Sequence, residues 1–195
     1  MIREATLRDI PDVVNIHHST LSDDFFPNLG KRVLTTIYRD STNSKLYVYE
    51  VNTTITGFIK VTFTKPIILS RLMNMSLYLL VLLISWEIIK NPFALYYLSE
   101  YLIYSLKKDP VKTEIVALAV LPNWQRKNIG TQLVNRIEEE ITKKRIGTYK
   151  VVTRDTHIPA NQFYKKMRFT WTANIRLFGK GRNIYIKNLN DAKSF

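Results

Sequence analysis

The sequence predicts an α/β fold, in the broad sense that includes α+β, formed by one domain over residues 1–195. From residue 113, apolar and amphipathic segments follow one another in the order strand, loop, helix, strand, helix, strand. Earlier in the chain, two alternating segments within residues 45–63 flank a turn and indicate paired strands. A hydrophobic content of 46% with 23% charged residues suffices for one buried core and argues against overall disorder.

The chain begins with a short predicted strand, residues 2–5, followed by a helix. Thr6 is of a residue type that caps helix N-termini, and apolar residues recur after it at helical spacing. We expect His17 and His18 to be helix-face residues rather than ligands. A second helix is predicted after Pro27. On the first helix, the residues that recur at helical spacing on one face are Ile10, Val13, Val14 and His17.

A β-hairpin is predicted next. Residues 45–51 alternate as a strand, residues 52–54 form the turn, and residues 55–63 return. Gly57 lies inside the second strand, where glycine indicates a β-bulge.

An apolar, aromatic-rich stretch, residues 66–106, follows this hairpin. Its longest apolar run, residues 77–84, is too short for a membrane crossing, which needs about 20 mostly apolar residues. Pro92 divides the stretch, so a helical hairpin is predicted. Such a hairpin can add core helices, wall a substrate site, pair with a second subunit in a homodimer, or lie on a membrane surface through residues 70–107. The sequence leaves these four roles open.

The next helix is predicted to stop at Gly147, because glycine is favoured where helices end. Glutamates 138–140 are predicted on its outer face, opposite Leu133, Val134, Ile137 and Ile141. We then expect a strand over residues 149–153, a short helix over 159–167 and a terminal hairpin over 169–187.

Composition excludes several classes of chemistry. The chain has no cysteine, which removes disulfides, thiolate metal sites and thiol nucleophiles. Its three histidines lack metal-ligand spacing with carboxylates, so no metal site is predicted. The first residues show no secretory signal, and we expect a cytoplasmic protein. A net charge of +13 attracts polyanions, but no nucleic-acid-binding motif accompanies it, so nucleic acid is not the expected partner.

Residues 114–131 are the most informative segment. They form an apolar strand, a Pro turn, a polar loop and the start of an amphipathic helix. The free amides and the dipole of a helix N-terminus favour negative charge, so this segment is a candidate anion site. The loop lacks the Lys-Ser/Thr ending of nucleoside-triphosphate loops and the three glycines of dinucleotide loops, so ATP and NAD are not expected.

The same segment resembles the signature of the GNAT acyl-CoA N-acyltransferases, Leu-x-Val-x-Pro-x-x-(Arg/Gln)-x-x-Gly-x-(Gly/Ala). Asn128 replaces one glycine, and asparagine is the residue that best tolerates a positive φ after glycine. The matching residues are Leu118, Val120, Pro122, Gln125 and Gly130.

Residues 157–169 resemble a second landmark of that family, Asn-x-x-Ala-x-x-Phe-Tyr-x-Lys-x-Gly-Phe. His157 stands for the Asn and Arg168 for the Gly, while the central Phe-Tyr-x-Lys survives at residues 163–166. The two landmarks occur in the expected order and on the expected strand and helix, which makes the resemblance specific.

The resemblance implies the GNAT fold, a mixed central sheet of about six to seven strands flanked by helices. The chain resembles the branch of the family with a helical insert after the third strand, here about residues 66–108. It also implies acetyl-CoA as acetyl donor, with Arg126 and Lys127 adding positive charge near its pyrophosphate and the Val120 amide facing the thioester oxygen. The residues to which it assigns cofactor contact are Leu118, Ala119, Val120, Gln125, Arg126, Lys127, Asn128, Ile129, Gly130, Thr131 and His157.

Two catalytic roles follow from the same resemblance. Tyr164 matches the general acid that protonates the departing thiolate, and Glu114 resembles the general base of one branch of the family. Without cysteine, direct attack of a primary amine in a ternary complex is expected instead of an acyl-enzyme. The acceptor stays open between an amino sugar, a small amine, and a protein lysine or N-terminus.

Two other readings fit the same sequence. The replacements at His157 and Arg168 also suit a module that binds CoA without turning it over. The net charge and the 66–106 stretch suit a basic protein associated with a membrane surface or nucleic acid.

Overall fold

The computed structural model describes residues 1–21, 31–39, 41–64, 96, 99–100, 103–104 and 109–190. Most of the predicted insert, residues 66–108, lies outside these ranges, so its four open roles stay untested. Within the described residues, no helix is both long and apolar enough to cross a membrane.

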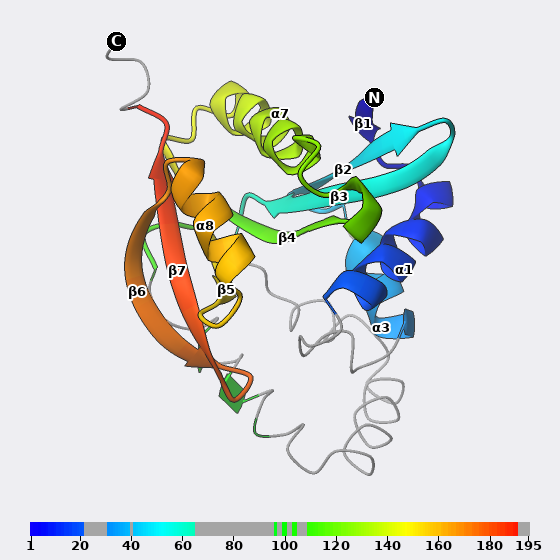
Figure 1. Ribbon diagram of the computed structural model, residues 1–195. Coiled ribbons are helices and arrows are strands. Elements are labelled where there is room, and N and C mark those ends of the chain that lie inside the picture. The colour runs from blue at the N-terminus through cyan, green and yellow to red at the C-terminus, as the bar shows by residue number, and fades with distance from the viewer. Residues whose placement is uncertain are drawn as a thin grey trace.

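The described strands form one seven-stranded sheet in the order β1-β2-β3-β4-β5-β7-β6 (Figure 1). Only β4 and β5 run parallel, and every other neighbouring pair is antiparallel. The predicted α/β class with a mixed sheet is therefore confirmed. The strands are β1 (Ile2–Glu4), β2 (Ser44–Val51), β3 (Thr54–Thr62), β4 (Glu114–Val120), β5 (Thr148–Arg154), β6 (Thr170–Leu177) and β7 (Lys180–Asn188).

Helices cover both faces of this sheet and bury an apolar core on each. The helices in the described residues are α1 (Ile10–Thr20), α3 (Lys31–Arg39), α7 (Ile129–Lys143) and α8 (Ile158–Lys166), with 3-10 turns at Leu7–Asp9 and Pro122–Trp124. Helices α1 and α3 pack on one face, whereas α7 and α8 cover the other (Figure 1). Because side chains alternate along a strand, Phe58 contributes to the α1–α3 core and its neighbour Ile59 to the α7–α8 core.

The predicted bulge near Gly57 is present. Tyr49 pairs with Gly57 and Glu50 with Ile55, which leaves Thr56 as the extra residue of β3. A Cβ atom on Gly57 would lie 3.0 Å from the Ala119 carbonyl oxygen and 3.1 Å from a Val120 methyl. Glycine at this position therefore also allows the close approach of β3 to β4.

The end of α7 differs from the prediction at Gly147. The helix closes two residues earlier, with Arg145 in the left-handed region at φ 57°. The Ile146 amide donates to the Ile141 carbonyl at 3.1 Å and the Arg145 amide to the Thr142 carbonyl at 2.9 Å, the two bonds of a Schellman motif. A Cβ on Gly147 would lie 2.7 Å from the side-chain amide nitrogen of exposed Asn190, so a larger residue here would displace that side chain.

The three glutamates of α7 do not all face outward as predicted. Glu139 is exposed, but Glu138 is half-buried and accepts hydrogen bonds from the Tyr149 hydroxyl at 2.5 Å and the Lys187 ammonium at 2.6 Å. Glu138 therefore ties α7 to β5 and β7, a contact that helical spacing alone does not reveal.

The Asp9 carboxylate joins β1 to the start of α1. It accepts two hydrogen bonds from the Arg3 guanidinium, at 2.7 and 2.8 Å, and two more from the Thr6 amide and hydroxyl, at 2.7 and 2.8 Å. The Arg3 bonds are the largest cause that holds the pKa of Asp9 well below its usual range. This buried carboxylate favours the folded state wherever it is ionised.

We predict that Asp9→Asn lowers the free energy of unfolding by about 2–3 kcal/mol at pH 7, because charge-assisted hydrogen bonds are lost. The native pKa is lowered, so the stabilisation is complete above the unfolded pKa of about 3.9 and is lost as pH falls further. Urea titrations should therefore show the gap to wild type closing below that pH. Exposed Asp12→Asn is the control, and equal losses in both variants would contradict the assignment.

Candidate functional site

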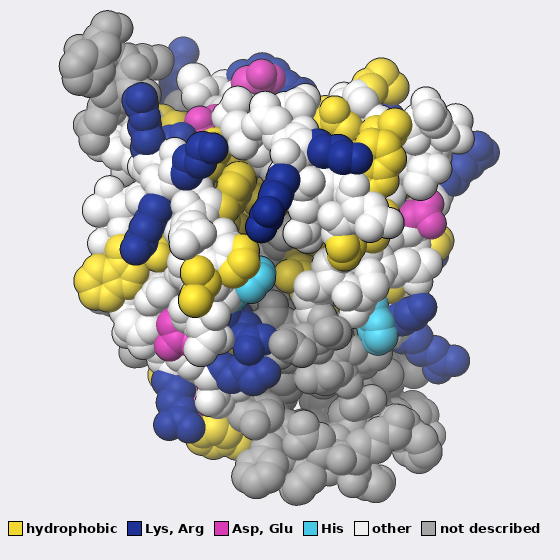
Figure 2. Space-filling view, in the orientation of Figure 1, with side chains coloured by type: hydrophobic (Ala, Val, Ile, Leu, Met, Phe, Trp, Pro, Cys, Tyr) yellow, Lys and Arg dark blue, Asp and Glu magenta, His cyan; other side chains and the backbone are white. Residues whose placement is uncertain are grey.

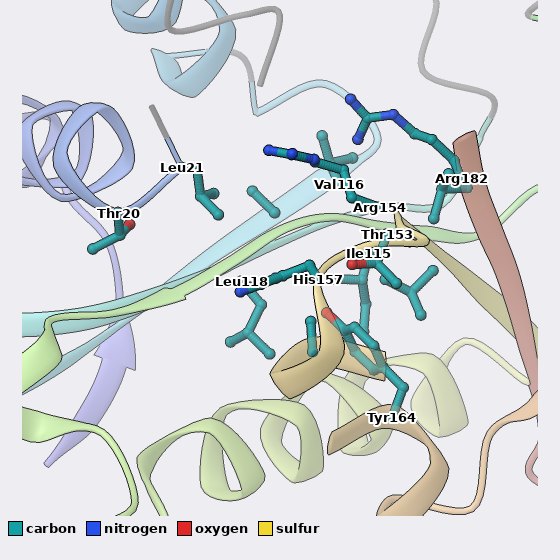
Figure 3. A pocket seen from close by; sticks show the side chains of 14 residues that line it. Thr20, Leu21, Ile115, Val116, Leu118, Thr153, Arg154, His157, Tyr164 and Arg182 are labelled. Atoms are coloured by element: carbon teal, nitrogen blue, oxygen red, sulfur yellow. The ribbon is translucent and has the colours of Figure 1, made fainter. Parts of the chain in front are cut away.

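The sheet splits between its two parallel strands. Only Glu114 with Lys150 and Ile115 with Val151 are paired, although β4 and β5 each contain seven residues. Beyond these pairs, the strands enclose a cleft of about 180 Å³. Residues of β4, β5, β7, α8 and the end of α1 line it (Figure 3).

A bulge in β4 coincides with this split. Lys60 of β3 pairs with Ala117 and Val61 with Ile115, which leaves Val116 as the extra residue. A bulge bends its strand and increases the local twist. It lies directly after the last β4–β5 pair, so β4 leaves β5 while staying paired with β3.

The register of β4 indicates which of its backbone groups face the cleft. The Leu121 amide donates to the Thr56 carbonyl at 2.9 Å, which makes this a hydrogen-bonded pair. Hydrogen-bonded and non-hydrogen-bonded pairs alternate in antiparallel strands, so Leu118 and Val120 belong to the other kind. Their N–H and C=O groups point away from β3, toward the split. The Val120 carbonyl accordingly accepts a bond from the Gln125 side chain at 3.0 Å.

The loop after β4 presents further amides. Asn128 has φ 63° immediately before α7, which confirms that asparagine here adopts the left-handed conformation. Arg126 is also left-handed, at φ 59°. The first backbone bond of the helix runs from the Gln132 amide to the Asn128 carbonyl at 3.1 Å, and no described side chain caps this end. The amides of residues 129–131 therefore face outward at the positive end of the dipole.

Tyr164 brings a protonated hydroxyl group to the cleft. The side chain extends from α8, is 6% exposed, and packs edge-on against Phe163 and Phe169. Its hydroxyl points toward the gap between β4 and β5 (Figure 3). Burial raises the pKa of this phenol, so it is protonated at neutral pH and can donate.

Glu114 lies at the closed end of the split and is absent from the cleft lining. It is buried, with its Oε2 3.2 Å from the Tyr104 hydroxyl and 3.4 Å from the Lys150 ammonium. Burial raises the pKa of Glu114, and Lys150 opposes this shift. Tyr164 packs in the core of the α7–α8 face together with Ile115. Because neighbouring strand residues alternate, Glu114 points to the opposite face.

The other predicted site residues fall into two groups: two line the cleft, and the rest follow it along the chain. Leu118 and His157 line the cleft, and His157 is the exposed residue that precedes α8. The Lys127 ammonium lies 4.5 Å from the centre of the Trp124 ring. Lys and Arg side chains surround a hollowed, partly hydrophobic area on this face (Figure 2). The residues that continue from the cleft along the end of β4 into α7 are Ala119, Val120, Gln125, Arg126, Lys127, Asn128, Ile129, Gly130 and Thr131.

Among the cleft residues that sequence reasoning missed, four come from elements that carry no motif. Thr20 and Leu21 come from the end of α1, Arg154 from the end of β5 and Arg182 from β7. They belong to no common motif and meet only because α1 and β7 reach the same split. No pattern within one segment could have identified them.

A mixed sheet that splits beside β4, with outward amides and a buried tyrosine, defines an acyltransferase of the GNAT type. The chain belongs to the acetyltransferase (GNAT) family, whose family model matches residues 15–169. No curated protein sequence matches it.

Solved structures share its fold at low sequence identity. Ard1 from Thermoplasma volcanium is 17% identical with a TM-score of 0.63, over 96% of both chains. The ribosomal-protein-S18-alanine N-acetyltransferase from Escherichia coli is 12% identical with a TM-score of 0.62, over 97% of this chain and 93% of its own. PaiA N-acetyltransferase from Thermoplasma acidophilum, in complex with coenzyme A, is 16% identical with a TM-score of 0.61, over 96% and 98%.

If this loop binds coenzyme A, as proposed below, Asn128→Gly should preserve that binding, because glycine adopts positive φ freely, whereas Asn128→Val should weaken it at least about tenfold through strain in the loop. Isothermal titration calorimetry with coenzyme A measures both variants. Asn123→Val, exposed in the preceding turn, is the control. Equal affinities for the glycine and valine variants would contradict a role for the left-handed residue.

A second prediction concerns Lys150, whose side chain is 5% exposed. Its ammonium lies 2.5 Å from Asp109 and 2.8 Å from the Tyr104 hydroxyl, beside Glu114. Lys150→Met removes the buried cation beside the carboxylates of Asp109 and Glu114 and should cost about 3–5 kcal/mol of stability at pH 7.

The loss should shrink at low pH. Glu114 already has a raised pKa in the folded state, so in Lys150→Met the folded protein binds its proton more tightly than the unfolded chain. Stability then falls as pH rises above about 4.3, the unfolded value for Glu. Urea denaturation at several pH values tests this, with exposed Lys143→Met as control. A pH-independent loss would contradict the charge explanation.

Proposed function

We propose that this protein is an acetyl-CoA-dependent N-acetyltransferase that transfers the acetyl group to a primary amine by direct attack in a ternary complex. The observation that carries the proposal is the split beside β4, which Leu118 and Tyr164 both line and toward which the amides of Leu118 and Val120 point. The family and the coenzyme A complex of the Thermoplasma acidophilum structure support acetyl-CoA as the donor.

The residues present fit such a donor. Unpaired N–H and C=O groups along a strand edge can bind an extended, amide-containing arm by strand addition. The amides that open α7, with Arg126 and Lys127 in the loop before it, suit a pyrophosphate. Acetyl-CoA, when bound, supplies an acetyl group activated as a thioester. Because acetyl-CoA is a metabolite of the cytoplasm, the cytoplasm is the proposed site of action.

The chain then supplies orientation and one proton. In the transfer, a C–N bond forms to the acetyl carbonyl carbon as the C–S bond breaks. The Val120 amide hydrogen-bonds the carbonyl oxygen as its negative charge develops, and Tyr164 protonates the departing thiolate. No cysteine exists to carry an acyl group, so both reactants are held together and proximity lowers the barrier.

The attacking amine must lose one proton. Glu114 is the proposed acceptor, because burial raises its pKa toward the range that suits a base. It lies outside the cleft lining and on the face opposite Tyr164, so the proton reaches it through water. The proposal for Glu114 thus depends on a relay, whereas Tyr164 faces the cleft directly.

We predict that Tyr164→Phe lowers kcat at least about 100-fold without changing the affinity for acetyl-CoA, because only the donated proton is removed. The assay follows thiol release with a panel of primary amines, and calorimetry measures binding. Tyr185→Phe is the matched control, since this buried tyrosine donates to Asn161 at 2.9 Å and is absent from the cleft lining.

Different outcomes separate the proposed enzyme from its competitors. Acetyl-CoA binding without thiol release for any amine would identify a binding module instead. Equal activity of the Tyr164 and Tyr185 variants would remove Tyr164 from the mechanism.

Glu114→Gln tests the proposed base. Loss of the acidic limb of the kcat/KM pH profile supports the relay through Glu114, and an unchanged profile contradicts it.

A further inference from the structure

Asn161 is a buried asparagine on α8, at a position that the second landmark leaves unspecified. It is 8% exposed, and its side-chain nitrogen faces the segment that joins β5 to α8. The Nδ2 atom donates to the carbonyls of Arg154 and His157, both at 2.8 Å, and lies 3.3 Å from the carbonyl of Asp155. A side-chain amide has two N–H groups, so both are used. The nitrogen therefore ties the end of β5 to the first turn of α8.

The oxygen of the same amide faces β7. Asn161 Oδ1 accepts from Asn183 Nδ2 and from the Tyr185 hydroxyl, both at 2.9 Å. The Asn183 oxygen accepts in turn from the Trp171 indole at 3.0 Å and from the Asn174 amide at 3.1 Å, both on β6. Backbone carbonyls can only accept, so the carbonyls of the β5–α8 segment determine which way the Asn161 amide points. One amide thus joins α8 and the end of β5 to the terminal hairpin.

The segment tied by Asn161 forms one wall of the cleft. Arg154 ends β5 and His157 precedes α8, and both residues line the cleft. Helix α8 packs over β5 and β7 (Figure 1). Tyr164 follows Asn161 by three residues, so the two buried side chains share one face of the helix. Asn161 is absent from the cleft lining and therefore supports this wall from outside.

The hydroxyl of Tyr164 has no anchor of its own in the described part of the chain. Its ring packs edge-on against Phe163, with ring centres 5.3 Å apart, and against Phe169, at 5.4 Å. Burial is the only cause that raises the pKa of Tyr164, and no described group hydrogen-bonds its hydroxyl. The helix that holds the ring therefore sets the position of this hydroxyl. A misplacement of about 1 Å in a reacting group can lower a rate about 100-fold.

We propose that Asn161 is a positioning residue for the acetyl transfer: it fixes α8 against β5 and β7 and so sets the distance from the Tyr164 hydroxyl to the departing sulfur. The proposal rests on the proposed transferase activity and extends it to a residue outside the cleft. The amides proposed to hold acetyl-CoA belong to β4 and α7, and within the described residues Asn161 hydrogen-bonds neither element. Loss of Asn161 should therefore impair proton donation more than donor binding.

The first experiment removes only the donor side of the amide. Asn161→Asp keeps the size of the side chain but places an oxygen against the carbonyls of the β5–α8 segment. We expect kcat, measured by thiol release with the best amine of the panel, to fall about 10- to 100-fold, while KM and the calorimetric Kd for acetyl-CoA change less than about threefold. An unchanged kcat, or a loss that appears wholly in KM or Kd, would overturn the proposal.

Matched variants separate position from charge and from stability. Asn188→Asp makes the same change at an exposed asparagine whose side-chain oxygen accepts from the Asn190 amide, a bond that aspartate keeps. Asp9→Asn destabilises the fold at a residue absent from the cleft lining. Both should keep the wild-type kcat at a temperature where thermal unfolding shows every variant to be folded. Tyr185→Phe should keep it too, because the bonds of the Asn161 nitrogen remain. Where Asn161→Asp does not fold, Asn161→Ala, which adds no charge, takes its place with the same expected loss.

A double-mutant cycle tests whether Asn161 acts through Tyr164. In the Tyr164→Phe background the donated proton is already missing, so Asn161→Asp should lower kcat further by less than about threefold. A residue that supports the cleft only in a general way would cost as much in this background as in the wild type, because the effects of independent sites add. Additive losses would therefore contradict a positioning role.

Hydrogen exchange measures the same tie without turnover. The backbone amides of α8 should exchange at least about tenfold faster in Asn161→Asp than in Asn188→Asp, because the start of the helix has lost its bonds to β5. If the wild type acetylates amines and Asn161→Asp keeps its kcat, the transferase stands and the positioning role fails. If the wild type acetylates no amine, the transferase itself fails, and the exchange rates alone decide whether Asn161 holds α8 in place.

Discussion

The short pairing between β4 and β5 is the constraint on which the site depends. Two residue pairs hold the parallel strands together, and the bulge at Val116 directs the rest of β4 away from β5. A sheet normally satisfies its backbone groups by continuous pairing, and a buried split without partners is costly. Here the unpaired backbone groups of β4 lie where a ligand with its own amides can pair with them. The same split lets side chains from both faces of the sheet approach one space.

That space is asymmetric across the sheet. The α7–α8 face contributes the loop amides and a tyrosine whose pKa is raised by burial, both suited to a negatively charged donor and its leaving group. The opposite face contributes the end of α1 and two paired arginines. The division follows from the twofold alternation of strand side chains, because adjacent residues of β5 must serve different faces. Groups that approach from the two faces of the sheet can therefore meet in one cleft.

Sequence reasoning was accurate where a feature depends only on residues close to it in the chain. Asn128 adopts positive φ because this depends on its own backbone preference, and the bulge expected near Gly57 is present. Prediction failed where a contact with residues on other elements determines the orientation of a side chain. Glu138 turns inward to reach Tyr149 on β5 and Lys187 on β7. The role of Glu114 as a base stays a prediction, and the fold adds that its carboxylate lies beside Lys150 and Tyr104.

The sequence by itself determined the class of protein: the order of strands and helices, the loop before α7 with its left-handed asparagine, and the Phe-Tyr-x-Lys segment of α8 are local patterns within short stretches of chain. Only the tertiary structure decided which side chains share the cleft. Arg154 and Arg182 are 28 positions apart and become neighbours through the β5–β7 register, while Tyr164 is brought to the same split from a helix on the other face. Strand register and the side of the sheet are global properties, because they depend on how every element packs at once. No local propensity encodes them.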